Sequence, residues 1–436
     1  MGTYIPSTAD EQQGMLEAIG LSSLDDLYEV VPPEVRLQSL DLPAGMSEME
    51  VIEGMASLAD RNQRFRSIFR GAGAYRHHIP AIVKTVTSKE EFLTAYTPYQ
   101  AEISQGVLQS IFEYQTQVCE LTGMEVSNAS VYDGATAAAE AVLMCEERKR
   151  SGVVVSATVN PQLIAVIRTY CESRDVPVTV VPADGCATDV AGLQAALAEG
   201  AASVLVQSPN FYGVIEDMDA VVATAHEQGA KVIMSFNPIS LGLLKTPGEY
   251  GCDIAVGEGQ PLGMPLGFGG PYLGIMATTQ KLMRKLPGRI VGETVDAQGR
   301  RAFVLTLQAR EQHIRREKAS SNICSNEALC AMTASVYLAA VGPQGLREVA
   351  ASSAAHAHYL AGQIADLGFA LRSDKPYFNE FLTECPVDAE MLCDKLAERG
   401  ILAGLPTDGG ILWCCTEMNT KQQVDLLVEA LKEVCA

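Results

Sequence analysis

The fold is decided by five short apolar runs: Val153-Val154-Val155, Val178-Thr179-Val180-Val181, Ser203-Val204-Leu205-Val206, Lys231-Val232-Ile233-Met234 and Asp253-Ile254-Ala255-Val256. Segments of helical length, 161–174, 189–199 and 218–229, separate most of these runs. Apolar runs that alternate with helices are typical of a parallel sheet buried on both faces. The sequence therefore predicts a large α/β domain.

The pattern changes on both sides of this region. Residues 1–70 are predicted as a helical arm, with helical spacing of apolar residues from Ser47 to Arg70 and a stop at Val31-Pro32-Pro33. Helices are also expected at 106–121 and 135–150. After about residue 310, Ala-rich helices at 326–341 and 345–366 precede short mixed elements. We therefore predict three domains, 1–70, 71–310 and 311–436, the last a smaller α+β domain.

Composition excludes several classes of protein. The chain has 436 residues, of which 47% are hydrophobic and 19% charged, and its net charge is −21. Such an acidic chain is a poor partner for nucleic acid or an anionic membrane surface. The first residues lack the basic and apolar regions of a secretory signal, and no run of 18 apolar residues occurs. These features predict a cytoplasmic protein that binds neither nucleic acid nor membrane.

The cysteines and histidines do not form a recognisable metal or disulfide pattern. The 12 cysteines are scattered, without a Cys-x-x-Cys, and the only close pair, Cys414-Cys415, is adjacent. The six histidines do not complete a ligand set with them. We therefore expect no metal, and reduced thiols in a cytosolic protein.

Three segments are candidates for ligand contact. The glycine-rich stretch 257–274 is neither a dinucleotide fingerprint nor a P-loop, and a tight loop between two strands is its simplest interpretation. Tyr132-Asp133-Gly134-Ala135-Thr136-Ala137 precedes a helix, where free N–H groups bind phosphate or an Asp caps the helix. Segment 96–106 is a polar, Pro-containing loop before another helix, which suits ligand contact or a capped turn.

Charge is unevenly distributed along the chain. Residues 281–318 contain ten cations and four anions, so this stretch carries +6 and the remainder −27. A basic stretch in an acidic chain is either a solvated face or a contact surface for an acidic partner. Both interpretations remain open from the sequence.

Four long motifs together resemble one family. They are Thr97-Pro-Tyr-Gln-Ala-Glu-Ile-Ser-Gln-Gly106, Tyr132-Asp-Gly-Ala-Thr136, Pro265-Leu-Gly-Phe-Gly-Gly-Pro271 and Arg310-Glu-Gln-His-Ile-Arg-Arg-Glu-Lys-Ala-Ser-Ser-Asn-Ile-Cys324. The chain resembles, from its first residues to its last, the α subunit (subunit 1) of two-subunit glycine dehydrogenase (decarboxylating), the P-protein of the glycine cleavage system.

The resemblance implies a fold, a cofactor and a reaction. It implies the pyridoxal-phosphate aspartate-aminotransferase fold (fold type I), with a mostly parallel sheet in the large domain and a smaller C-terminal domain. Glycine would condense with pyridoxal phosphate, the electron sink for the carbanion, and lose CO2. Its aminomethyl group would then pass to the lipoyl arm of the H-protein.

The residues expected to hold that cofactor are missing. Enzymes of this fold need a Schiff-base lysine soon after a strand, yet none of the 12 lysines lies between 246 and 280. The His-Lys-Thr of the family's catalytic subunit aligns with Gly259, Gln260 and Pro261, so Gln260 stands at the lysine position. The strand expected to end in an Asp ends in Asn237 instead. The resemblance thus predicts no catalytic residue and no covalently bound cofactor in this chain.

The chain is therefore predicted to pair with a homologous β subunit in an α2β2 assembly. Tyr96, Thr97, Pro98, Tyr99 and Gln100 are predicted to line the β subunit's active site, because active sites of this fold lie at subunit interfaces. Asp133, Gly134, Ala135 and Thr136 would form a relic phosphate turn. Two alternatives remain: a self-sufficient pyridoxal-phosphate enzyme using Lys245 or Lys281, and a structural homologue without a partner.

Overall fold

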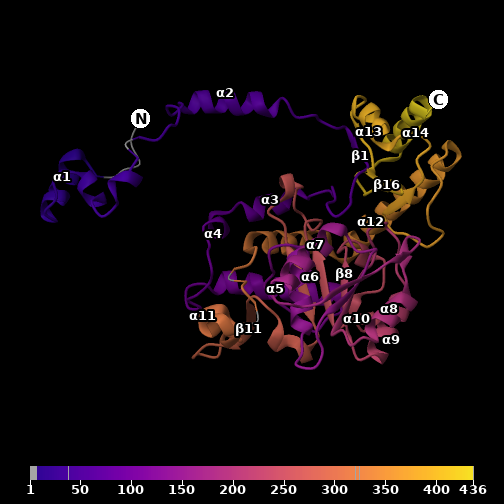
Figure 1. The fold of residues 1–436 in the computed structure, drawn as a ribbon, viewed down its shortest axis with the longest axis horizontal. Coiled ribbons are helices and arrows are strands. Elements are labelled where there is room, and N and C mark those ends of the chain that lie inside the picture. The colour runs from indigo at the N-terminus through magenta and orange to yellow at the C-terminus, as the bar shows by residue number, and fades with distance from the viewer. Residues whose placement is uncertain (1–6, 38, 320, 324, 436) are drawn as a thin grey trace. The chain divides into compact units, whose positions relative to one another are not determined.

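The computed structural model describes residues 7–37, 39–319, 321–323 and 325–435, drawn as a ribbon in Figure 1. Ser320 and Cys324 of the fourth motif lie outside these residues. The chain divides into two compact units, Met1–Gln63 and Arg64–Ala436. The predicted boundaries at 70 and 310 stay predictions.

The first unit contains two helices with capping boxes. In α1 (Ala9–Ala18) the Thr8 hydroxyl accepts from the Glu11 N–H, and in α2 (Glu48–Ala59) the Ser47 hydroxyl accepts from the Glu50 N–H. A 3₁₀ helix, Leu24–Tyr28, lies between them, with a second at Pro33–Val35. The helical spacing predicted to reach Arg70 ends at Ala59, and α2 buries none of its residues. Its apolar side chains, among them Met49 and Ile52, are exposed.

The second unit is built on a seven-stranded sheet in the order β2-β10-β9-β8-β7-β3-β4. Its strands are β2 (Val126–Ser127), β3 (Val153–Ser156), β4 (Val178–Val181), β7 (Ser203–Gln207), β8 (Lys231–Phe236), β9 (Ile254–Glu258) and β10 (Gly274–Thr278). Strands β4, β3, β7, β8 and β9 are parallel to one another, and β10 runs antiparallel to β9 and β2. All five predicted apolar runs form parallel strands of this sheet.

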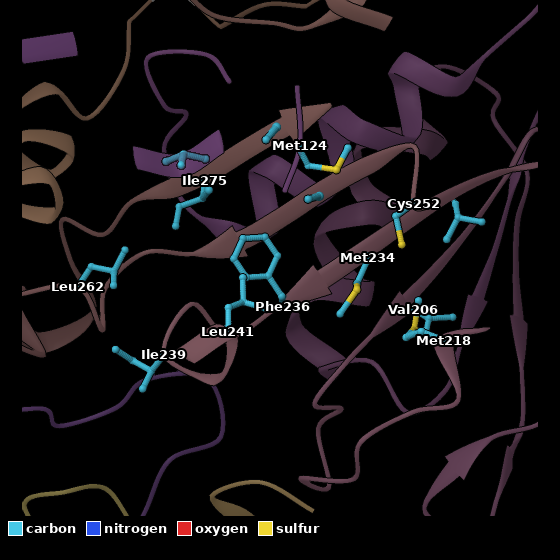
Figure 2. Packing of buried hydrophobic residues seen from close by; sticks show 14 of the residues in the cluster. Met124, Val206, Met218, Met234, Phe236, Ile239, Leu241, Cys252, Leu262 and Ile275 are labelled. Atoms are coloured by element: carbon cyan, nitrogen blue, oxygen red, sulfur yellow. The ribbon is translucent and has the colours of Figure 1, made fainter. Parts of the chain in front are cut away.

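The two faces of the sheet carry separate hydrophobic cores. Val154, Val204 and Met234 lie in one core, together with side chains of α8 (Val190–Leu197) and α9 (Met218–Glu227), part of which Figure 2 shows. Their neighbours Val155 and Leu205 lie in the other core, with α6 (Gly134–Cys145) and α7 (Pro161–Glu172). Successive strand residues point to opposite faces, so a sheet covered on both sides needs unbroken apolar runs.

Several helices differ from the predicted ranges at their ends. Helix α6 ends at Cys145 rather than Arg150, because residues 147 and 150 pair as an isolated bridge and Glu146 accepts from the Gly152 N–H. Helix α5 (Gln105–Thr122) matches its prediction closely and ends at Gly123 in the left-handed conformation. Shorter helices are α3 (Ala81–Thr87), α4 (Glu90–Leu93), α10 (Pro247–Tyr250) and α11 (Gln312–Arg315).

The two predicted Ala-rich helices are joined as α12 (Ala328–Ile364), whose backbone breaks at Gly342 with φ 62°. By length and hydropathy the segment Ala328–Leu367 could cross a membrane. However, Pro343 follows the break in this helix. The buried side chains of α12 belong to two hydrophobic cores, as in a core helix.

A second, smaller sheet lies in the C-terminal part. Strands β13 (Glu380–Thr383), β16 (Gly410–Cys414) and β15 (Leu405–Thr407) are antiparallel, and α13 (Ala389–Ala397) and α14 (Lys421–Cys435) contribute to their core around Trp413. Strand β1 (Ser67–Ile68) pairs in parallel with β14 (Ile401–Leu402). Two hairpins complete the unit, β5 (Ala183–Asp184) with β6 (Ala187–Thr188) and β11 (Ile290–Val295) with β12 (Arg301–Thr306).

Candidate functional site

A cavity of about 620 Å³ lies at the carboxyl ends of the parallel strands. Gln207 ends β7, residues 235–236 end β8 and 237–238 follow it, and Glu258 ends β9. All of these residues line the cavity. The rest of the wall comes from residues 72–75, 132–135 and 269–272, from Asn160, Gln162, Leu163 and Val166, and from Glu327. In α/β folds this edge of the sheet is where ligands bind.

The predicted phosphate turn forms part of this wall. Asp133, Gly134 and Ala135 line the cavity, and Thr136 is buried one residue further along α6. Asp133 is the N-cap of α6, and its Oδ1 accepts from the Thr136 N–H at 2.7 Å. Of the two interpretations of this turn, the structure therefore has the one in which an Asp caps the helix.

Glu258 is a half-buried carboxylate that the sequence did not single out. Its Oε2 accepts from the Gly134 N–H at 3.0 Å, at the amino end of α6. Its Oε1 accepts from the N–H groups of Gln260 and Leu273, both at 3.0 Å. Burial raises the pKa of Glu258 to about 7, against the lowering effect of these three donors. A Cβ at position 134 would lie 2.8 Å from the Glu258 nitrogen, so only glycine allows this approach.

Gln260 lies behind the cavity wall. Its side chain is buried, with Oε1 accepting from the Tyr75 N–H and Nε2 donating to the Tyr75 carbonyl, both at 2.9 Å. Nε2 also donates to the Met264 carbonyl at 2.9 Å. The side-chain amide therefore fastens the segment 72–75 to the turn that follows β9.

The same segment is held from its other side by Glu380 on β13. Glu380 Oε1 accepts from the Ala72 N–H at 2.6 Å, and Oε2 accepts from the Tyr75 hydroxyl at 2.7 Å. Burial raises the pKa of the Glu380 carboxyl to about 7. The wall of the cavity thus joins the large sheet to the C-terminal sheet.

Replacing Glu380 by Gln is expected to reduce the pH dependence of stability. A carboxyl whose pKa is higher in the folded state stabilises the fold below its ordinary pKa of about 4.5, and this stabilisation is lost as the pH rises towards 7. Gln keeps a hydrogen bond to both partners and does not titrate. Between pH 5 and pH 8, the free energy of unfolding of E380Q should rise relative to wild type by about 3 kcal/mol.

Urea denaturation at both pH values measures this difference. The control is E384Q, which removes an exposed carboxyl that pairs with Arg372 just beyond the same strand. If the free energy of unfolding of E380Q and of wild type depended equally on pH, the raised pKa of the Glu380 carboxyl would be contradicted.

The loop predicted to reach a partner lies away from the cavity. Tyr96 and Tyr99 are exposed by 78% and 67%, and none of the residues 96–100 lines the cavity. The Tyr99 ring lies over the guanidinium of Arg289, which is buried, at 5.7 Å from the ring centre. Pro98 is buried. The loop is thus anchored at Pro98 and by Arg289 while its polar groups face outward.

Several cations of the basic stretch 281–318 have local partners. Arg300 pairs with Asp296 and Arg301 with Glu293, both at 2.7 Å. Lys285 donates to the carbonyls of Met144 and Glu146. These three side chains are therefore bonded to neighbouring groups of the same chain, which favours the interpretation as a solvated face over a contact surface for an acidic partner.

Comparison with known proteins identifies the family. The model of the "Glycine cleavage system P-protein" family matches residues 2–431. The chain is 49% identical to the probable glycine dehydrogenase (decarboxylating) subunit 1 of Moorella thermoacetica, over all of both chains. It is also 49% identical to that of Chlorobium luteolum, over 99% of each. The chain belongs to the P-protein family.

Within the P-protein family the relatives are enzyme subunits, which confirms the motif-based prediction of a glycine dehydrogenase subunit 1. A solved glycine decarboxylase (P-protein) in inhibitor-bound form superimposes with a TM-score of 0.93 at 46% identity, covering 99% of this chain and all of that one. An alanine–glyoxylate aminotransferase from Nostoc shares only the fold, with a TM-score of 0.59 at 17% identity over 92% and 98% of the chains. The predicted pyridoxal-phosphate fold type I is therefore confirmed.

The residues of this cavity do not fit pyridoxal phosphate. Lys, Arg and His are absent from the described residues that line it, whereas Asp133, Glu258 and Glu327 place three carboxyls there. Asn237 turns its Oδ1 to the Ile239 N–H at 3.0 Å. Lys245 pairs with Asp219 at 2.7 Å on the surface, and Lys281 is exposed. A phosphate ester would therefore meet carboxylates instead of cations.

Within the described ranges, no three His, Cys, Asp or Glu side chains are grouped to hold a metal ion. The cysteines described there are unbridged, and most are buried. Burial raises the pKa of the Cys145 and Cys252 thiols to about 12, so these cysteines are apolar packing residues.

Proposed function

We propose that this chain is the subunit of glycine dehydrogenase that does not bind the cofactor, and that it acts with a β subunit that carries the cofactor lysine. The β subunit would hold pyridoxal phosphate covalently, and the cofactor would serve as electron sink when glycine loses CO2. The complex would be α2β2 and would deliver the aminomethyl group to the lipoyl arm of the H-protein. We place it in the cytoplasm.

Gln260 carries this proposal. It occupies the turn directly after β9, where the family's catalytic subunit has its lysine, and both atoms of its amide group are already bonded within the chain. An amide does not form an imine. The carboxyl-lined cavity and Asn237 support the same conclusion independently.

The exposed loop 96–100 supports a contribution to the partner's site. Its hydroxyl and amide groups project from an anchored backbone, as is needed for residues that complete a site on another subunit. The first unit supports assembly as well, since the single helix α2 exposes Met49, Ile52 and Met55 and buries none of its residues. Contiguous exposed apolar groups mark interaction surfaces.

The purified chain mixed with pyridoxal phosphate is expected to show no imine absorbance, and borohydride reduction should attach no cofactor to it. The same treatment of the complex with a β subunit that carries a His-Lys-Thr turn should label the β subunit alone. Mass spectrometry of the separated chains identifies the labelled one. Label on Lys245 or Lys281 of this chain would favour the self-sufficient enzyme, and failure to form a complex would favour the structural homologue.

A further inference from the structure

The amino end of α6 has the geometry of an anion site. Helix N-termini attract anions because their first N–H groups lack partners within the helix. Here the Gly134 N–H points at Glu258 Oε2, and two further N–H groups, those of Gln260 and Leu273, converge on Oε1. Three backbone donors from three separate segments therefore surround one carboxylate.

This carboxylate comes from the chain itself. Glu258 ends β9, and the close approach of Gly134 to its backbone fixes the distance between strand end and helix start. Asp133 accepts from the Thr136 N–H, two residues further along the same helix. Two of the first three N–H groups of α6, those of Gly134 and Thr136, are thus already bonded to carboxylates.

We propose that Glu258 closes this cavity to phosphate-bearing ligands by holding the anion position at the amino end of α6. The proposal extends the proposed function, because it adds a second barrier to cofactor binding that does not depend on the missing lysine. A lysine at position 260 would not by itself give this subunit a cofactor site.

Binding measurements on the full chain test the role of Glu258. Isothermal titration calorimetry with inorganic sulfate, pyridoxal phosphate and pyridoxal is compared for wild type, E258A and E327A. E258A should bind sulfate and pyridoxal phosphate at least roughly tenfold more tightly than wild type, since it frees three N–H donors. Pyridoxal, which lacks phosphate, should bind all three proteins equally. Acetate should compete with sulfate in E258A, because it restores a carboxylate.

The matched control is E327A. Glu327 lines the same cavity, but its side chain does not cap the helix that it precedes, so its removal lowers the negative charge without freeing the α6 donors. If E327A gained affinity as E258A does, or if E258A gained none, the proposal would be overturned. Should E258A not fold, E258S, which keeps one acceptor, takes its place. Tight binding of pyridoxal phosphate to wild type would contradict the proposed function itself.

Discussion

Replacing Tyr99 by Phe together with Gln100 by Ala is expected to lower glycine decarboxylation by the complex roughly ten- to hundredfold. The Phe ring still covers the Arg289 guanidinium, so the loop keeps its anchor. What is lost is one hydroxyl and one amide, both exposed in the free subunit. A hydrogen bond to a charged group contributes about 1.5–3 kcal/mol, which corresponds to about that change in rate.

The measurement is the rate of CO2 release by subunits mixed in equal amounts, with complex formation checked by gel filtration. Q344A is the matched control, because Gln344 lies on the surface of α12 and its side chain bonds to Glu348 of the same helix. An unchanged rate with an intact complex would mean that the loop does not line the partner's site.

Replacing Gly213 by Ala is expected to destabilise the chain by more than about 4 kcal/mol. Gly213 has a φ of +84°, and a Cβ there would lie 1.9 Å from the Glu380 carbonyl oxygen. Its own carbonyl accepts from the Phe378 N–H, so the backbone cannot move away without breaking the junction to the C-terminal sheet. The midpoint of urea denaturation measures the loss.

The control for this substitution is G185A. Gly185 also has a positive φ, +61°, but a Cβ there has no neighbour within 4 Å. It should therefore cost only the backbone strain, about 1–2 kcal/mol. Equal losses in G213A and G185A would show that the clash at Gly213 is relieved by a small shift.

The large sheet was predictable because its strands are buried on both faces. A run such as Val204-Leu205-Val206 places successive side chains in two cores, and few other structures need this pattern. The ends of α6 and α2 were not predictable from spacing. The end of α6 depends on the turn at 146–152. The end of α2 lies on a helix that buries none of its residues, so no packing contact marks where it stops.

The candidate site was predictable only where a motif marks it. The turn 133–136 and Gln260 follow from the family pattern, but Glu258 does not. A Glu between two glycines at a strand end is typical of an exposed turn, and its role depends on a helix that begins 124 residues earlier. The bond between Tyr75 and Glu380 spans 305 residues, a distance over which local patterns carry no information.

The bonds of Gln260 make a change to lysine at this position unfavourable. The glutamine amide both accepts from and donates to the backbone of Tyr75, whereas a lysine ammonium has only donors. A single change to Lys would leave the buried N–H of Tyr75 without an acceptor. It would also loosen the segment 72–75, which Glu380 holds on its other side. On the proposed function, a return to an independent enzyme would pass through a less stable protein, so a division of labour between two chains would reinforce itself.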